Sequence, residues 1–186
     1  MASIIKFGSL VMNGEVCPFP TLRDGKDFWL GDTAEKHQIH WLVVDNKLVC
    51  CWNLITRLSW EELEAGRWAS GKPVFLDGFS FGCRLLQQSD DGSYEWDRAM
   101  EACGGDNAAF HWRNCPSWTR EKRSDESWAG LACGGEKSVE PYITAGWRPV
   151  LVPLGQDSPH DEFLPGWDLL VWGSNFVLDG VLQEQT

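Results

Sequence analysis

The sequence lacks several features that would assign it to a familiar class. No apolar run approaches the roughly 18 residues that a helix needs to cross a bilayer, so we expect no membrane-spanning helix. Residues 1–11 contain one lysine and no small-residue cleavage site after a long apolar core, so we expect no secretory signal. A nucleophile elbow, a Walker loop and a dinucleotide fingerprint are also missing, and the glycine pairs at 104–105 and 134–135 are typical of loops.

Basic residues are scarce and do not cluster. The 16 lysines and arginines face 27 aspartates and glutamates, which gives a net charge of −11. A nucleic acid or an anionic membrane would repel such a chain, so we predict neither as a direct partner. An acidic surface has two interpretations: it keeps the protein in solution, or it competes with nucleic acid for a basic protein. The residues considered for it are Glu61, Glu62, Glu64, Asp90 and Asp91.

The cysteines lack the pattern of a disulfide framework. There are seven, an odd number, and no Cys-x-x-Cys pair occurs. Cys50 and Cys51 lie in an apolar run, where adjacent side chains of a strand point to opposite faces. We therefore expect free, buried thiols in a reducing compartment, namely the cytoplasm.

Metal-ligating residue types occur, but not at the spacing of a defined site. Three thiolates and one imidazole could bind zinc: Cys103, His111, Cys115 and Cys133. Their spacings in the sequence match no known zinc module. His37 and His40, near Asp32, could bind a metal or act as acid and base if they lay on one helix. The strand-like run that follows argues against a helix there. We predict no metal and no cofactor.

The remaining composition favours one globular domain over residues 1–186. Hydrophobic residues make up 43% of the chain and charged residues 23%. Tryptophan is unusually common, with 12 residues, and we interpret most of them as core filling. A few could instead form a recognition surface, because tryptophan is enriched at the energetic centres of interfaces.

Local patterns predict an α+β fold made of short antiparallel hairpins and two helices. Turn residues predict hairpins over 39–44 with 47–52, over 73–76 with 79–86, and over 167–172 with 175–178. Single strands are expected over 3–12 and 147–154, and a polar linker begins at Ser158. One helix follows the capping box that starts at Ser59, and the second spans 94–103. Residues 106–141 show no period and are expected to form a long, irregular, tryptophan-rich loop region.

Four segments in order carry a resemblance to a known family. The first is Leu58-Ser-Trp-Glu-Glu-Leu followed by Gly71-Lys-Pro-Val-Phe-Leu-Asp-Gly-Phe-Ser-Phe and Arg84-Leu-Leu, and the others are Tyr94-Glu-Trp-Asp-Arg, His111-Trp-Arg-Asn-Cys-Pro-Ser-Trp-Thr-Arg-Glu, and Gly146-Trp-Arg-Pro-Val-Leu. The chain resembles uncharacterised phage and prophage proteins whose domain is similar to the C-type-lectin-like fold of formylglycine-generating enzymes. The resemblance covers residues 41–154. Residues 1–40 and 155–186 lie outside it and are expected to be additions packed on the domain.

The resemblance does not extend to the oxidase chemistry of that fold. Formylglycine-generating enzymes bind copper through two cysteines on a late strand, and residues 147–154 contain no cysteine. Within the closing segment, Arg148 precedes Pro149 and is therefore expected to be extended. Its forked guanidinium could hold loop carbonyls or a carboxylate, and we favour the structural role.

The resemblance, the thiols and the charge together favour a non-enzymatic binding protein encoded by a phage or mobile element. The function we predict is inhibition of a bacterial defence system through contact with a host protein, for instance a defence factor that binds nucleic acid. The contact residues are expected on the tryptophan-rich loops and the closing segment, with the indole rings partly exposed: Trp112, Arg113, Trp118, Arg120, Trp128 and Arg148.

Two alternatives remain at this stage. The first is a protein that binds or sequesters a nucleotide-like ligand, with aromatic rings on the base and Arg113, Arg120 or Arg148 on the phosphate. The second is a metal-dependent, oxidase-like enzyme that descends from the catalytic branch of the fold. A binding assay with nucleotides and a metal analysis would distinguish these alternatives from the first hypothesis.

Overall fold

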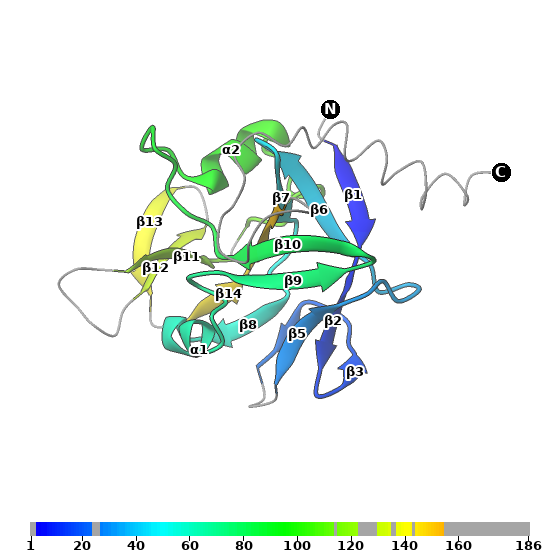
Figure 1. Cartoon of the computed structure of the whole chain (residues 1–186). Coiled ribbons are helices and arrows are strands. Elements are labelled where there is room, and N and C mark those ends of the chain that lie inside the picture. Colours follow the sequence, from blue (N-terminus) through cyan, green and yellow to red (C-terminus); the bar gives the residue numbers. More distant parts are fainter. Residues whose placement is uncertain are drawn as a thin grey trace.

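The described chain is mostly β-sheet with two short helices, and its strands curl into a half-barrel (Figure 1). The computed structural model describes the backbone of residues 3–23, 27–113, 115–122, 130–134, 137–142 and 144–154. The α+β prediction is confirmed at this level. No helix within these residues has the length and apolar character needed to cross a membrane. The predicted hairpin over 167–172 and 175–178 and the linker from Ser158 lie outside the described residues.

The first six-stranded sheet is antiparallel throughout and is built from strands far apart in the sequence. Its order is β1 (Ile4–Phe7), β6 (Ile39–Val44), β7 (Lys47–Cys50), β15 (Val150–Pro153), β10 (Phe79–Arg84) and β9 (Lys72–Leu76). The strand latest in the sequence, β15, therefore lies between two hairpins that form much earlier in the chain.

Both predicted hairpins in this sheet are confirmed. Asp45 and Asn46 connect β6 to β7 with φ values of 46° and 58°. Asp77 and Gly78 connect β9 to β10 with φ values of 49° and 85°. Positive φ at both central positions gives the turn a twist that matches the strands, which is why these residue pairs fix the register.

The second six-stranded sheet corrects the prediction that residues 106–141 are irregular. Its order is β13 (Lys137–Tyr142), β12 (Gly130–Gly134), β11 (Ser117–Lys122), β14 (Ala145–Trp147), β8 (Ile55–Leu58) and β4 (Thr21–Leu22). Three of these strands fall in the segment expected to be a loop region. Register shifts interrupt both the β11–β12 and the β12–β13 pairings, and such irregularities remove the alternation that would identify strands in the sequence.

The predicted strand over 147–154 is divided between the two sheets. β14 ends at Trp147 and β15 begins at Val150, so Arg148 and Pro149 form the crossing. The predicted strand over 3–12 is likewise divided at Gly8, whose φ is 65°. In both places a residue with special backbone behaviour lets the chain leave one sheet and enter another.

A third, small sheet forms a separate lobe at one end of the molecule, below β9 in Figure 1. It consists of β3 (Glu15–Val16), β2 (Ser9–Met12) and β5 (Phe28–Gly31), in that order. The face with Leu10, Met12 and Leu30 is buried, which anchors the lobe to the larger sheets.

Both predicted helices form, with the expected ends. α1 (Trp60–Ala65) starts at a capping box in which Ser59 Oγ accepts from Glu62 N at 3.2 Å and Glu62 accepts from Ser59 N at 2.8 Å. α2 (Glu95–Ala102) buries Trp96 and Ala99 and is followed by two glycines with positive φ.

The core consists of two clusters, one on each side of the first sheet. Cys50 belongs to one and Cys51 to the other, which confirms that adjacent cysteines point to opposite faces. All seven cysteines are free thiols. Core filling by tryptophan is also confirmed for the following buried rings: Trp41, Trp68, Trp96, Trp112, Trp118 and Trp147.

The close approach of β14 to Asn53 gives a first prediction. A Cβ on Gly146 would lie 2.2 Å from Cγ of Asn53, whose buried amide accepts from Ser117 Oγ. Gly146→Ala should lower the free energy of unfolding by about 3 kcal/mol, because Asn53 must move and leave buried partners unpaired. Urea denaturation measures this loss. The control is Gly92→Ala, where φ is 82° and the space around the Cβ is open, with an expected loss of about 1 kcal/mol; equal losses would contradict the prediction.

Candidate functional site

Arg148 lies at the crossing between the two large sheets and is fully buried. Its Nε donates to Ser117 Oγ at 2.9 Å, and one Nη donates to the Cys50 carbonyl at 2.9 Å. The other Nη donates to the His111 carbonyl. Each nitrogen of the guanidinium is therefore engaged by the fold, which confirms the favoured structural role and leaves the side chain poorly suited to contact a partner.

Aromatic rings take the place of a carboxylate beside this buried cation. The Arg148 Cζ lies 4.3 Å from the Phe110 ring centroid and 5.2 Å from that of Trp96. Burial lowers the pKa of Arg148 to about 10, so the guanidinium still carries its charge at neutral pH. The protein thus stabilises a buried charge with carbonyl dipoles and ring faces.

The expectation that Trp112 and Trp118 are partly exposed is wrong. Trp118 is 0% exposed and Trp112 is 8% exposed. The indole N–H of Trp118 donates to the Leu58 carbonyl at 2.9 Å, and that of Trp112 donates to the Gly105 carbonyl at 3.1 Å. A tryptophan can be buried without cost to its N–H when a backbone carbonyl accepts it, and both rings are fixed in this way.

The other predicted contact residues divide into two groups. Arg113 and Arg120 are exposed; the Arg113 Cζ lies 5.1 Å from the Trp112 ring centroid, and an Arg120 Nη donates to Gln87 Oε1 at 3.2 Å. Trp128 lies outside the described residues. Among the predicted contact residues that the structure describes, only these two arginines are exposed. The described members of the set therefore do not form an aromatic recognition face.

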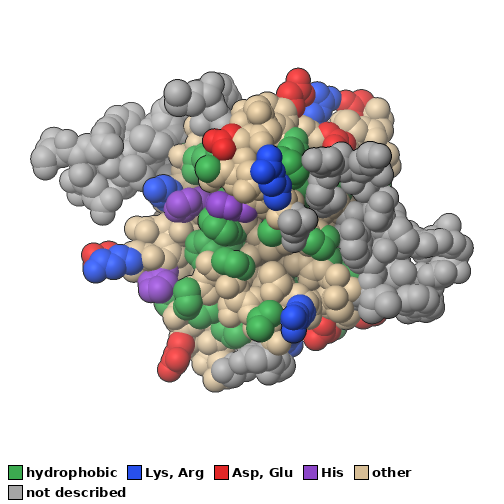
Figure 2. All heavy atoms as spheres, turned by 180° about the vertical axis from the view of Figure 1, so that it is seen from behind, with side chains coloured by type: hydrophobic (Ala, Val, Ile, Leu, Met, Phe, Trp, Pro, Cys, Tyr) green, Lys and Arg blue, Asp and Glu red, His purple; other side chains and the backbone are tan. Residues whose placement is uncertain are grey.

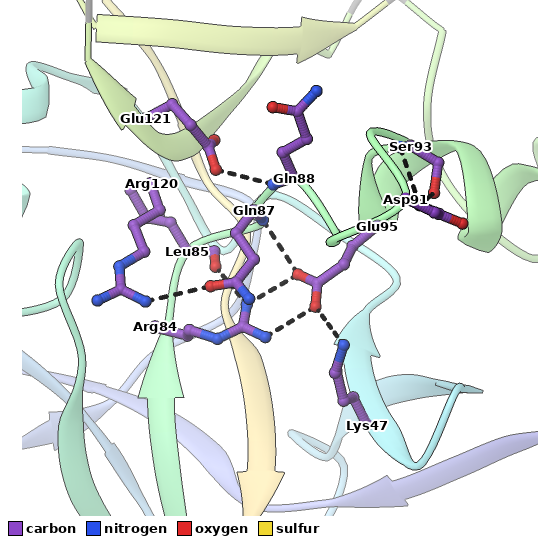
Figure 3. Close-up of polar contacts among 10 residues, drawn as sticks. All are labelled: Lys47, Arg84, Leu85, Gln87, Gln88, Asp91, Ser93, Glu95, Arg120 and Glu121. Carbon is purple, nitrogen blue, oxygen red and sulfur yellow. Dashed lines mark hydrogen bonds and ion pairs between the residues drawn. The ribbon is translucent and has the colours of Figure 1, made fainter. Parts of the chain in front are cut away.

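A buried ion-pair network ties α2 to the first sheet (Figure 3). The Glu95 carboxylate accepts from both terminal nitrogens of Arg84 at 2.7 Å, from Lys47 Nζ at 2.8 Å and from Gln87 N at 3.0 Å. Burial acts to raise the pKa of Glu95, but the hydrogen bonds and charges of Arg84 and Lys47 outweigh burial and hold the pKa below its usual value. All acceptor positions are used, so this network also serves the fold.

The network gives a second prediction. Glu95→Gln should lower the free energy of unfolding by about 3 kcal/mol, because it leaves the buried Arg84 guanidinium without its counter-charge. The matched control is Asp91→Asn, which removes the exposed partner of Arg98 and should have little effect. Chemical denaturation of the three proteins at neutral pH would test this. A Glu95→Gln protein as stable as the control would contradict the prediction.

The candidate zinc ligands are not brought together. Among the side chains that the structure describes, no three or more of the metal-ligating types form a group. Burial raises the pKa of the Cys133 thiol, one of these candidates, to about 12, so it is protonated at neutral pH. His37 and His40 do not share a helix, because His40 belongs to β6.

His40 and His111 are both half-buried, and His40 lies close enough to act electrostatically on His111. The His111 ring stacks on Trp52, with 3.1 Å between the ring centroids. Burial lowers the pKa of both imidazoles, and the charge of Lys6 near His40 and of Arg148 near His111 lowers it further. The folded protein therefore favours the neutral form of each ring.

This pair gives a third prediction. Because the pKa of each imidazole is lower in the folded state, its contribution to stability is present above the unfolded pKa of about 6.5 and is lost as pH falls through the folded value. The free energy of unfolding should therefore decrease between about pH 7 and pH 5. The His40→Gln, His111→Gln double variant should show a shallower decrease in denaturation curves over this range. Identical slopes for the two proteins would refute this assignment.

The predicted acidic residues do not form one surface. Glu61, Glu62 and Glu64 lie on α1, whereas Asp90 and Asp91 precede α2, at the other side of the molecule (Figure 1). Several have local partners: Glu62 caps α1, Glu64 accepts from Ser70 N at 3.0 Å, and Asp91 pairs with Arg98. From behind, hydrophobic side chains occupy the middle of the visible face and acidic ones lie near its margin (Figure 2).

The outer face of the small sheet carries an exposed apolar row that the sequence analysis missed. Val11 lies directly opposite Val16 on β3 and opposite Trp29 on β5. Val16 and Trp29 are each 41% exposed, and among the tryptophans with described side chains Trp29 alone is exposed. We call Val11, Val16 and Trp29 the outer row. No sequence signal marks it, because Leu10, Val11 and Met12 on β2 and Phe28, Trp29 and Leu30 on β5 are consecutive apolar residues without the polar–apolar alternation that would indicate an outer face.

Comparisons with known proteins add no functional assignment. No protein-family model, curated protein or solved structure matches this chain. The function therefore has to be inferred from the residues that the fold leaves exposed or unpaired.

Proposed function

We propose that this protein is a non-enzymatic binding protein whose contact face is the outer row of the small sheet. The observation that carries the proposal is the solvent exposure of Trp29 beside two valines, in a chain that buries most of its described tryptophans. A contiguous apolar patch on a protein surface marks an interaction site more often than single exposed residues do. Tryptophan in such a patch is a typical centre of binding energy.

The outer row is held on a rigid frame. A Cβ on Gly31 would lie 2.9 Å from Cγ2 of Val11, so glycine at this position leaves room for the valine side chain. The lobe is also tied to the β9–β10 turn, because Asp77 accepts from Thr33 N at 2.8 Å and from Thr33 Oγ1 at 2.6 Å. A preformed face loses less conformational entropy when a partner binds.

The charges around the outer row favour a partner with a basic rim. Glu15 and Asp27 are exposed at the ends of the neighbouring strands, and the whole chain carries a net charge of −11. An apolar knob surrounded by lysine and arginine would complement this arrangement, and long-range attraction would accelerate its association. Proteins that bind nucleic acid commonly present such basic surfaces.

We further propose a C-type-lectin-like fold and a phage origin, as the resemblance implies. The fold proposal is supported by α2 preceding a closing segment that joins both large sheets at β14 and β15. On this basis the partner is a host protein, and inhibition of a defence factor is the activity we infer. The apolar row lies within residues 1–40, which the resemblance does not cover.

A fourth prediction tests the contact face. Trp29→Ser combined with Val16→Thr should abolish capture of the partner from a bacterial lysate while the protein stays folded, because each residue is 41% exposed and lies outside the buried core. The partner retained by the unmodified protein should elute at raised salt concentration, as charge complementarity requires. Quantitative mass spectrometry of the captured proteins measures both effects.

The matched control is Phe75→Ser, which removes a ring that is 65% exposed on β9, outside the outer row. It should capture the same partner as the unmodified protein. Equal capture by the Trp29 and Val16 double variant would exclude the outer row as the contact face. A captured protein with an acidic surface would contradict the proposed chemistry of the partner.

A further inference from the structure

Three aromatic rings form a compact cluster where the small lobe meets the large sheets. Phe28 stacks on Trp68 with 5.7 Å between centroids, and Trp147 lies 4.9 Å from Phe28 and 4.8 Å from Trp68. We call these residues the aromatic triad. Trp68 and Trp147 are buried, whereas Phe28 is half-buried and keeps part of its ring accessible.

Two cations lie on the aromatic triad. The Arg23 Cζ is 5.3 Å from the Phe28 centroid, and the Lys72 Nζ is 3.6 Å from the Trp68 centroid. The described chain places one carboxylate near Arg23, at 3.7 Å between Glu62 Oε1 and Arg23 Nε, which is too long for a hydrogen bond. Arg23 and Lys72 thus bring two positive charges to this corner of a protein of strongly negative net charge.

Several N–H donors at the triad are shielded from solvent and lack an acceptor. Within the described chain, Arg23 Nε, Arg23 Nη1 and Trp147 Nε1 have no hydrogen-bond partner. Trp147 is 0% exposed, so its indole N–H cannot turn to bulk water. Leaving buried donors unpaired is costly, and natural proteins usually satisfy them with protein, water or a ligand.

We propose that the aromatic triad, with Arg23 and Lys72, forms a site for the oxyanion of a small ligand. The unpartnered donors are Nε–H and Nη1–H of Arg23 and the indole N–H of Trp147, which would donate to the oxygens, and the Lys72 ammonium adds charge without a fixed bond geometry. A phosphate or carboxylate offers several acceptor sites, whereas one water molecule offers only two lone pairs to these donors. The site is separate from the outer row and does not depend on the proposed function.

Titration of the full chain with inorganic phosphate tests this fifth prediction. Saturable shifts of the Trp147 indole and Arg23 Nε–H resonances in nitrogen–proton NMR spectra are expected, relative to sodium chloride at equal ionic strength. Acetate and phenyl phosphate serve as further probes. Tighter binding of acetate identifies a carboxylate ligand, tighter binding of phosphate identifies a phosphate ligand, and a further gain with phenyl phosphate indicates an aromatic group on it.

Variants locate the site independently of folding effects. Arg23→Gln should weaken phosphate binding by about tenfold or more, and Arg23→Lys, which keeps the charge but loses the fork, should weaken it by a smaller factor. The matched controls Arg113→Gln and Trp29→Ser should bind phosphate as the unmodified protein does. The proposal is overturned by shifts no larger than those with chloride, or by equal affinity in Arg23→Gln, which would indicate an adventitious ion only.

Discussion

The buried guanidinium of Arg148 is the interaction on which the architecture depends. It joins the end of β7, the segment at His111 and the start of β11 through three hydrogen bonds, and it lies at the crossing between β14 and β15. A buried cation without a carboxylate is tolerated only when all its acceptors are in place. The two large sheets and the tryptophan-rich segment must therefore assemble together around this one side chain, and Phe110 and Trp96 close the site by packing on the guanidinium.

Polar side chains at the centre of the molecule have hydrogen-bond partners inside the protein, so a site for a partner or ligand is expected nearer the surface. Arg148, Glu95 and the indole of Trp118 all have partners inside the protein. Two groups of residues that the described chain leaves exposed or unpaired lie around the small lobe instead: the outer row on its exposed face, and the aromatic triad with Arg23 where it joins the large sheets. The large sheets therefore support the small lobe, and both proposed binding sites, the outer row and the aromatic triad, lie on or beside that lobe.

Local sequence signals predicted the parts of the fold that depend on local chemistry. The turns at Asp45-Asn46 and Asp77-Gly78 and the capping box at Ser59 were identified because each motif satisfies its own backbone within a few residues. The strands β11 to β13 were missed, because register shifts interrupt the pairings between these consecutive strands and remove the regular alternation that would indicate them. The burial of Trp112 and Trp118 could not be predicted either, since their indole N–H groups bond to the carbonyls of Gly105 and Leu58, which only the folded chain brings into reach.

The central position of β14 and β15 has a consequence for how the chain reaches its native state. Residues 145–153 supply inner strands of both large sheets, while three of their four neighbours, β7, β8 and β10, lie some 60 to 100 positions earlier. During synthesis the ribosome releases those earlier strands before β14 and β15 exist, so each exposes an unpaired edge for that interval. Such long-range pairing slows folding, and an interrupted nascent chain would be prone to aggregate until the late strands close both sheets.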